Sequence, residues 1–283
     1  RRKTVKTSEI YIRDPFILPF EGKYYMYASN FPKGFKAYVS ENLEDWSEPV
    51  EVINFPDGFW ATKDFWAPEV HFYKGNFYLF ASLCSENRNR GTQIFRASSP
   101  LGPFEIISDG PQTPAEWMCL DGTLYVDKCG TPYMVFCHDW LQIKNGEMCY
   151  IKLSDDLSRA AGEPQLMFKA HDFPFVHPYV ADDCYVTDGC FMRRNTNGDL
   201  LMIWSSYGEK GYFEGVLKSD NGEIDGDWSA CPFLFETNGG HGMIFKDFDG
   251  GLKLCLHSPN RPAGAERMKL FEIEDKNGVL SVK

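Results

Sequence analysis

Asp14-Pro15-Phe16-Ile17 and, after six intervening residues, Tyr24-Tyr25-Met26-Tyr27-Ala28-Ser29 enclose a turn that contains glycine. An apolar run, a turn and an aromatic-rich run ending in a small residue recur four more times. The recurrences are Ala67–Val70 with Phe77–Ser82, Asp121–Leu124 with Tyr133–Cys137, Asp188–Phe191 with Leu201–Ser206, and His241–Ile244 with Leu252–Ser258. Their first positions, 14, 67, 121, 188 and 241, are separated by 53, 54, 67 and 53 residues. A period near fifty in a strand-rich chain indicates a radial or solenoid repeat.

Each repeat unit is expected to form four short strands. In the first unit these are Pro15–Leu18, Lys23–Ala28, Phe35–Ser40 and Glu48–Val52, joined by polar turns. No stretch of twelve residues shows a helical stripe. Five such units around an axis predict an all-β fold, a five-bladed β-propeller with four-stranded antiparallel blades around a central channel, formed by residues 1–283 as one domain. A β-sandwich is the competing all-β fold, but it does not explain the near-constant step.

Two irregular segments carry their own predictions. The longer third unit predicts an insertion around Phe168–Asp182, which is rich in Pro, His and aromatic residues. Val5–Tyr11 reads as a strand that precedes the first unit, while the fifth unit looks short after Phe271–Ile273. We therefore expect the N-terminal strand to pair with a blade from the other end of the chain and close the ring, which removes two open sheet edges.

Composition limits the classes of partner. The net charge of −11 argues against nucleic acid, anionic membranes and polyanionic substrates. The sequence has no run of eighteen apolar residues, as a membrane-spanning helix requires. Nine cysteines without a C-x-x-C pair, most of them in apolar runs, predict free buried thiols. We expect a monomer. The start at Arg1-Arg2-Lys3 lacks Met, which favours a secreted or periplasmic protein over a cytoplasmic one, although no apolar leader segment precedes it.

The first positions of the repeats point to chemistry. In a propeller the first strand of every blade starts at the same end of the channel, so these residues converge on one mouth. Asp14, Asp121 and Asp188 lead units I, III and IV. Carboxylates brought together repel one another, so one of them should hold a proton near neutral pH. One acid and one ionised carboxylate are the minimum needed to cleave a glycosidic bond. Asp-Pro and Asp-Gly are also ordinary turn dipeptides, but three at one position favour a functional site.

Five motifs in order resemble glycoside hydrolase family 43 over nearly the whole chain. They are Arg13-Asp14-Pro15-Phe16-Ile17, Trp66-Ala67-Pro68-Glu69-Val70, Asp121-Gly122, Asp188-Gly189 and Gly240-His241-Gly242. The resemblance implies a five-bladed propeller that hydrolyses arabinose-, xylose- or galactose-containing glycans with inversion. It implies that Asp14 is the general base that activates water, and that Asp121 orients the acid and raises its pKa. It also implies that His241, near the channel centre, helps to hold a Ca²⁺ or Na⁺ ion through water, and no other cofactor is required.

The general acid departs from the family pattern. Where the family has Glu-Gly-Pro, this chain has Asp188-Gly189-Cys190. Aspartate is one methylene shorter, and proton donation needs an approach of about 2.6–3.2 Å. Three possibilities stay open: Asp188 is the acid, another carboxylate donates the proton, or the activity is lost. Glu147, at the start of the third strand of unit III, is the leading substitute, and Glu214 at the matching corner of unit IV is a weaker one.

The remaining candidate residues would bind the sugar. A sugar presents an apolar face and polar edges, so its pocket combines an aromatic ring with polar groups. Trp66 is our principal candidate for the ring, with Phe65 and Trp140 beside the strand ends. The expected polar contacts are Arg13, Glu69, His138 and His257.

We therefore expect an inverting hydrolase that releases pentose from plant-type glycans. The expected substrate is an α-L-arabinofuranoside or a β-xyloside. Its acid and base should lie about 6.5–9.5 Å apart to admit a water. The alternatives are a catalytically impaired carbohydrate-binding propeller and, without sugar binding, a protein-interaction propeller.

Overall fold

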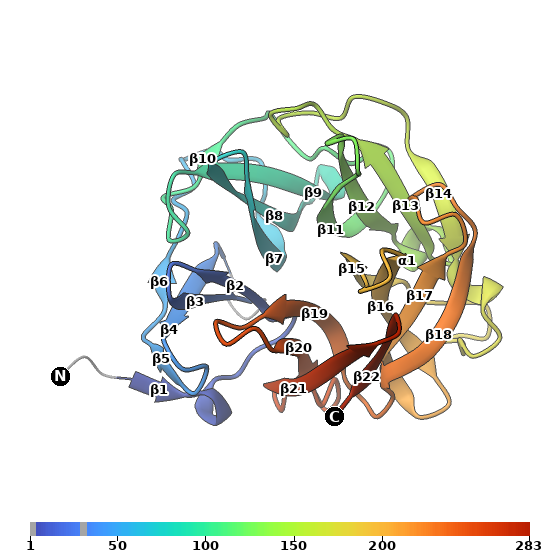
Figure 1. Ribbon diagram of the computed structural model, residues 1–283. Coiled ribbons are helices and arrows are strands. Elements are labelled where there is room, and N and C mark those ends of the chain that lie inside the picture. Colours follow the sequence, from blue (N-terminus) through green and yellow to red (C-terminus); the bar gives the residue numbers. More distant parts are fainter. Residues whose placement is uncertain (1–3, 29–32) are drawn as a thin grey trace.

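A computed structural model describes residues 4–28 and 33–283. Five antiparallel sheets stand in a ring around a central axis (Figure 1), which confirms the predicted five-bladed β-propeller. The sheets follow one another around the ring in chain order, and each blade runs from its innermost strand outward. The inner strands of neighbouring blades contact one another around the channel. Ser29, expected to end the second strand of the first unit, lies outside the described residues.

Blades II to V have the four strands that the repeat predicted, whereas blade I has six short strands. Blade I contains β1 (Thr4–Lys6), β2 (Phe16–Phe20), β3 (Lys23–Tyr27), β4 (Lys36–Ser40), β5 (Asp45–Ser47) and β6 (Val50–Glu51). Blade II contains β7 (Lys63–Tyr73), β8 (Asn76–Ser85), β9 (Arg88–Ala97) and β10 (Glu105–Ile106). Blade III contains β11 (Cys119–Val126), β12 (Pro132–His138), β13 (Glu147–Lys152) and β14 (Gln165–Lys169). Blade IV contains β15 (Asp188–Arg194), β16 (Leu200–Gly208), β17 (Gly211–Ser219) and β18 (Trp228–Phe235), and blade V contains β19 (Gly240–Lys246), β20 (Leu252–Ser258), β21 (Arg267–Lys276) and β22 (Val279–Val282).

The second strands of the blades explain why the repeated aromatic runs do not alternate with polar residues. A second strand lies inside its sheet, and both of its faces are covered by neighbouring blades. In β8 every residue from Phe77 to Cys84 is buried, and in β3 every residue from Tyr24 to Tyr27 is buried. A strand that is buried on both faces reads as a continuous apolar run, as in other sheets covered on two sides. The blades therefore share one another's cores, as a repeat architecture requires.

The prediction of how the ring closes was wrong. The N-terminal strand β1 pairs with β5 in its own blade and not with blade V. Blade V needs no borrowed strand, because a turn at Asn277 and Gly278, both with positive φ, folds β22 back onto β21. Two successive residues with positive φ are typical of the tight hairpin turns that match strand twist. The seam is closed instead by backbone contact between Ile12 and Glu266 and by apolar side chains shared between blades I and V.

The predicted insertion in the third unit is present. After β14 the chain forms a 3₁₀ turn, η2 (Ala170–Asp172), and then a segment of residues 173–187 without regular structure. We call this stretch the 173–187 segment. It is held to the corner of blade III by a hydrogen bond from Gly146 N to Tyr185 O and to blade IV by one from His177 N to Tyr207 O, each 2.8 Å long. The insertion therefore bridges blades III and IV.

Helical structure is minor in the described residues. It consists of α1 (Trp140–Ile143), η1 (Thr7–Glu9) and η2. Figure 1 shows α1 close to the axis of the ring. In the described chain no helix has the length and apolar character needed to cross a membrane. All nine cysteines are free, and six of them are buried, as their apolar settings predicted.

Candidate active site

A β-bulge at the start of the inner strands sets the geometry of the channel mouth. The pairing between inner and second strands shifts register there in blades II to V. In every blade one residue at this point has a left-handed backbone; these are Asp14, Ala67, Asp121, Gly189 and His241, with φ of 46°, 44°, 56°, 54° and 51°. Bulges next to a site serve to aim side chains.

The bulges correct the alignment of the repeats. We had placed Asp188 at the same position as Asp14 and Asp121, but Gly189 occupies that position. Asp188 stands one residue earlier, paired with Ser205, at the position that Trp66 holds in blade II. Blade IV needs glycine at the bulge because a Cβ on Gly189 would lie 2.8 Å from the ring of His241.

A cavity of about 450 Å³ opens at this mouth. Its lining includes the three sequence-predicted acids, Asp14, Asp121 and Asp188. Arg13, Trp66, Trp140 and His241 also line it, so the structure brings seven of the predicted residues together. The rest of the wall comes from residues that the repeats did not single out, above all Arg90, Tyr179, Tyr207, Tyr212 and Arg261. The volume is in the usual range for a small-molecule site.

His241 acts as the positive centre of the acidic group. Its Nδ1 lies 3.1 Å from Asp14 Oδ1 and 3.8 Å from Asp121 Oδ2. Burial acts to lower the pKa of His241, but the charges of the two carboxylates outweigh it and raise that pKa well above 6.5. His241 is therefore an imidazolium at neutral pH. Burial acts to raise the pKa of Asp14, yet the adjacent imidazolium and further hydrogen bonds hold it well below 3.8.

Asp188 is in the opposite electrostatic state. Burial, and then the negative charge of Asp121, raise the pKa of Asp188 to about 7. Burial also raises the pKa of Asp121 to about 6, although His241 opposes the shift. The buried hydroxyl of Tyr212 donates a hydrogen bond of 3.0 Å to Asp188 Oδ2, so the second oxygen, Oδ1, is the one left to carry a proton. The cavity thus joins a carboxylate with a low pKa to a carboxyl group that is protonated near neutral pH, as the convergence of acids predicted.

Asp14 is held from behind by blade V. His257 is fully buried and does not line the cavity; its Nδ1 lies 3.2 Å from both the backbone nitrogen and Oδ1 of Asp14. Its Nε2 lies 3.0 Å from Asn260 Oδ1. Arg13 donates to the same oxygen at 2.9 Å and forms an ion pair of 2.8 Å with Glu266. The structure therefore places His257 as a support for Asp14 and not as the direct sugar contact that we predicted.

The aromatic side of the mouth is also braced. The guanidinium of Arg90 lies 4.3 Å from the centroid of the Trp66 ring, a cation–π contact. Arg90 also pairs with Asp64 at 2.8 Å and with Asp139. Asp139 caps α1 by accepting from Leu141 N at 2.9 Å. Trp66 remains 38% exposed, so its ring is accessible to a ligand.

Four other predicted residues do not line the cavity, and one of them, Phe65, is buried in the hydrophobic core, where it cannot stack on a sugar. Glu147 and His138 are cross-strand partners in β13 and β12 and bind each other at 3.2 Å. Glu147 also pairs with Lys169 at 3.1 Å. Both partners of Glu147 thus come from strands of its own blade, β12 and β14. Glu69 is buried, and its Oε2 accepts from Thr123 at 2.6 Å and lies 2.9 Å from His71 Nε2.

Glu214, the weaker substitute acid, is fully buried beneath the mouth. Its Oε2 accepts hydrogen bonds from Ser205 Oγ at 2.9 Å and Gly242 N at 2.8 Å. Burial raises the pKa of Glu214 to about 8. Ser205 Oγ in turn accepts from His241 N at 2.7 Å. Glu214 therefore fixes the bulge that carries His241 and is not part of the cavity wall.

Comparisons with known proteins identify the family of this chain. The sequence model of the family "Glycosyl hydrolases family 43" matches residues 7–271. The chain belongs to this family. An extracellular exo-α-(1→5)-L-arabinofuranosidase of Cellvibrio japonicus is 25% identical over 174 residues, 56% of this chain and 47% of that protein. An extracellular endo-α-(1→5)-L-arabinanase of Bacillus subtilis is 20% identical over 145 residues, 47% of this chain and 45% of that protein. The chain thus spans about half the length of these relatives.

A solved structure agrees over the full propeller. The crystal structure of an endo-arabinase from Bacteroides thetaiotaomicron superposes with a TM-score of 0.91 at 37% sequence identity. The match covers 98% of this chain and 99% of that one.

The family resemblance also implied an ion near His241. His241 Nδ1 lies 3.1 Å from Asp14 Oδ1 and 3.8 Å from Asp121 Oδ2, so its nearest polar partners are these carboxylates. Within the described chain, no group of three or more His, Cys, Asp or Glu side chains is placed to hold a metal ion. An ion held near His241 through water stays a prediction.

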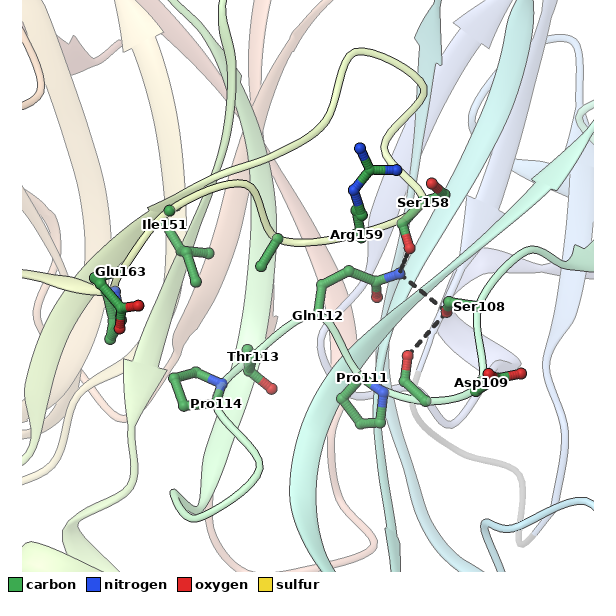
Figure 2. A pocket seen from close by; sticks show the side chains of 14 residues that line it. Ser108, Asp109, Pro111, Gln112, Thr113, Pro114, Ile151, Ser158, Arg159 and Glu163 are labelled. Carbon is green, nitrogen blue, oxygen red and sulfur yellow. Dashed lines mark hydrogen bonds between the residues drawn. The ribbon is translucent and has the colours of Figure 1, made fainter.

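A second hollow lies apart from the acids, between the outer parts of blades II and III (Figure 2). It has a volume of about 390 Å³. In Figure 2, Gln112 lies at its centre and donates to Ser108 Oγ at 3.0 Å and Ser158 O at 2.9 Å. Its lining contains no aromatic ring on which a sugar could stack. This hollow therefore lacks the aromatic platform that the channel mouth has in Trp66.

Sequence reasoning missed several residues of the cavity wall. Tyr207 and Tyr212 flank the hairpin between β16 and β17, and Arg90 follows the hairpin between β8 and β9. Second and third strands meet at the same end of the channel at which first strands begin. The same rule predicted Glu147 as a candidate, and it also places the hairpins that carry Tyr207, Tyr212 and Arg90 at the channel mouth. The sequence does not show which side chain of such a hairpin points into the channel.

Proposed function

We propose that this protein is an inverting glycoside hydrolase that acts on pentose-containing glycans, with α-L-arabinofuranosyl linkages as the leading substrate. The observation that carries the proposal is that Asp14, Asp121 and Asp188 line one cavity, where His241 lies 3.1 Å from Asp14 and the Tyr212 hydroxyl binds Asp188 at 3.0 Å. The pKa of Asp14 lies well below 3.8 and that of Asp188 is raised to about 7. Two carboxyl groups whose environments push their pKa values apart are the usual base and acid of a glycosidase.

In this mechanism Asp14 accepts a proton from the attacking water. Asp14 stays ionised because His241 and His257 hold it. The fixed hydrogen-bond partners also orient its oxygens, so that a water on one face of the sugar is aligned with the anomeric carbon. Inversion requires an acid–base separation of about 6.5–9.5 Å, which we expect here.

Asp188 donates the proton to the leaving oxygen. Asp121 keeps that proton in place near neutral pH because its own charge opposes ionisation of Asp188. Asp121 is held by a hydrogen bond of 3.0 Å from Gly189 N, the residue that follows Asp188. Tyr212 fixes the other oxygen of Asp188, which supports the shorter acid in a defined orientation. These contacts favour Asp188 over Glu147, whose carboxylate is bound by His138 and Lys169.

The substrate class rests on the comparisons. The names of the relatives refer to arabinofuranosidase, arabinanase and xylosidase activities. A neutral pentose suits a cavity in which the exposed face of Trp66 lies beside charged donors. Exposure of the ring allows the apolar face of a sugar to stack while Arg13 and Asp121 meet its hydroxyls.

A panel of aryl pentosides and linear or branched arabino- and xylo-oligosaccharides tests the proposal. We expect turnover with inversion of the anomeric configuration, followed by proton NMR, and loss of at least a thousandfold in Asp14→Asn. In Asp188→Asn the loss should be confined to poor leaving groups, because good ones depart without protonation. Retention of configuration would refute the mechanism. Binding without turnover would instead support the sugar-binding propeller to which the shorter acid also points.

A further inference from the structure

The 173–187 segment brings an aromatic wall to one side of the cavity. Tyr179 from this segment stacks on Tyr207 of blade IV with ring centroids 4.0 Å apart and planes 10° from parallel. It meets Trp140 of α1 edge to face at 5.9 Å. Arg261, from the loop after β20, donates to the Tyr179 hydroxyl at 2.9 Å. Three other parts of the chain, blade IV, α1 and the loop after β20, therefore contact Tyr179.

The orientation of the neighbouring amide group is fixed. Arg13 can only donate, so the Asn260 atom that it contacts at 2.9 Å is the oxygen. The amide nitrogen of Asn260 therefore faces Tyr207 and donates to its hydroxyl at 2.9 Å. The Tyr207 oxygen accepts this bond, and its own proton is free to go elsewhere.

The Tyr179 hydroxyl uses its oxygen to accept the hydrogen bond from Arg261. A hydroxyl group that accepts still has its own proton to donate, so the proton of Tyr179 is available to a ligand in the cavity that this residue lines.

The wall stands on the side of the acid. Tyr207 is the cross-strand partner of Tyr212, which donates to Asp188, and Tyr179 stacks on Tyr207; all of these residues line the same cavity. A general acid protonates the oxygen of the leaving group, so the departing sugar lies on its side of the scissile bond.

We propose that Tyr179, Arg261 and Trp140 form the binding site for the sugar on the leaving-group side. The Tyr179 hydroxyl donates to a hydroxyl oxygen of this sugar, Arg261 supplies a second donor, and the Trp140 ring covers its apolar face. This inference rests on the proposed function and deepens it, because it assigns the insertion of the third unit to recognition of a second pentose.

The test compares two kinds of substrate. An aryl pentoside has no sugar on the leaving-group side, whereas an arabino- or xylotriose does. In Tyr179→Phe, which keeps the stacked ring, we expect the ratio of kcat/KM for the trisaccharide to that for the aryl pentoside to fall about 3- to 10-fold, as for one lost hydrogen bond. Arg261→Ala should lower the same ratio. Tyr185→Phe is the matched control, because Tyr185 lies in the same segment and its hydroxyl bonds to Asp182 O at 3.4 Å, outside the cavity.

Binding measured without turnover separates this inference from the proposed function. In the Asp14→Asn background, calorimetry with mono-, di- and trisaccharides should show affinity that rises from one sugar to two, and Tyr179→Phe should remove most of that gain. If no substrate is turned over, the proposed function fails, and this measurement still decides the subsite. An unchanged ratio together with an unchanged affinity gain in both Tyr179→Phe and Arg261→Ala would overturn the inference. An equal loss of kcat/KM on both kinds of substrate would also overturn the inference, because it would show that Tyr179 and Arg261 act by supporting Asp188.

Discussion

Gly189→Ala tests whether the bulge of blade IV is fitted to His241. Gly189 has φ of +54°, and a Cβ there would lie 2.8 Å from two ring atoms of His241 and 2.9 Å from its Cα. The left-handed backbone costs alanine about 1–2 kcal/mol. The steric overlap adds about 1–3 kcal/mol, the usual effect of overpacking. We expect the free energy of unfolding to fall by about 2–5 kcal/mol.

Gly198→Ala provides the matched control. Gly198 also has positive φ, +86°, but a Cβ there would meet no atom within 4 Å. It lies in the turn at the far end of the same strand, β15. Only the backbone term applies, so the expected loss is about 1–2 kcal/mol. Urea unfolding at pH 6 gives both values, provided that the dependence on urea is the same in each variant.

Activity gives a second readout. Alanine keeps the N–H that Asp121 accepts, so any loss of kcat reports displacement of His241 and the acids around it. We expect kcat on an aryl pentoside to fall at least tenfold in Gly189→Ala and less than twofold in Gly198→Ala. Equal stability and equal kcat in the two variants would show that the close approach of Gly189 to His241 is not a constraint, and the reasoning would fail.

Three further predictions follow from the buried charges. Tyr212→Phe removes the hydrogen bond that lowers the pKa of Asp188. The alkaline limb of the pH–rate profile should therefore move above its original position near pH 7, and kcat should fall. An alkaline limb that does not move would exclude Asp188 as the acid. Glu214 has a folded-state pKa raised to about 8, so the folded protein holds a proton that the unfolded chain loses above about pH 4.5, and stability declines as pH rises between these values. Glu214→Gln should therefore reduce the loss of unfolding free energy between pH 5 and pH 8 by an amount on the order of 3 kcal/mol, measured by urea unfolding at both pH values. Arg90→Met leaves the buried carboxylate of Asp139 without its cation and should cost about 3–5 kcal/mol at pH 7, with a smaller loss when Asp139 is also replaced by Asn.

The positions of the elements were largely predictable. The repeated segments that begin at Asp14, Ala67 and His241 recur with a regular period. Each copy shows its own apolar runs in its local sequence, so the strands of each blade can be predicted without knowledge of the other blades. The strands of the first unit agree with their expected bounds to within about three residues. Ring closure was predicted wrongly, because Val5–Tyr11 is compatible with any free sheet edge and only three-dimensional proximity selects β5.

The candidate site shows the same division. Sequence alone indicated that Asp14, Asp121 and Asp188 meet at one mouth, and the three do line one cavity. The alignment of the repeats was wrong by one residue at Asp188, because Asp121-Gly122 in blade III and Asp188-Gly189 in blade IV have the same sequence. They differ because the residue with the left-handed backbone is Asp121 in one blade and Gly189 in the other.

The sequence by itself determined the propeller and which acids are available, because repeats and residue types are written along the chain. Only the tertiary structure decided which acid is charged and which is protonated, because a pKa depends on burial and on charges from other blades. The His241 cation beside Asp14 and the Asp121 charge beside Asp188 come from segments more than 60 residues away in sequence. Contact between such segments is set by the closing of the ring.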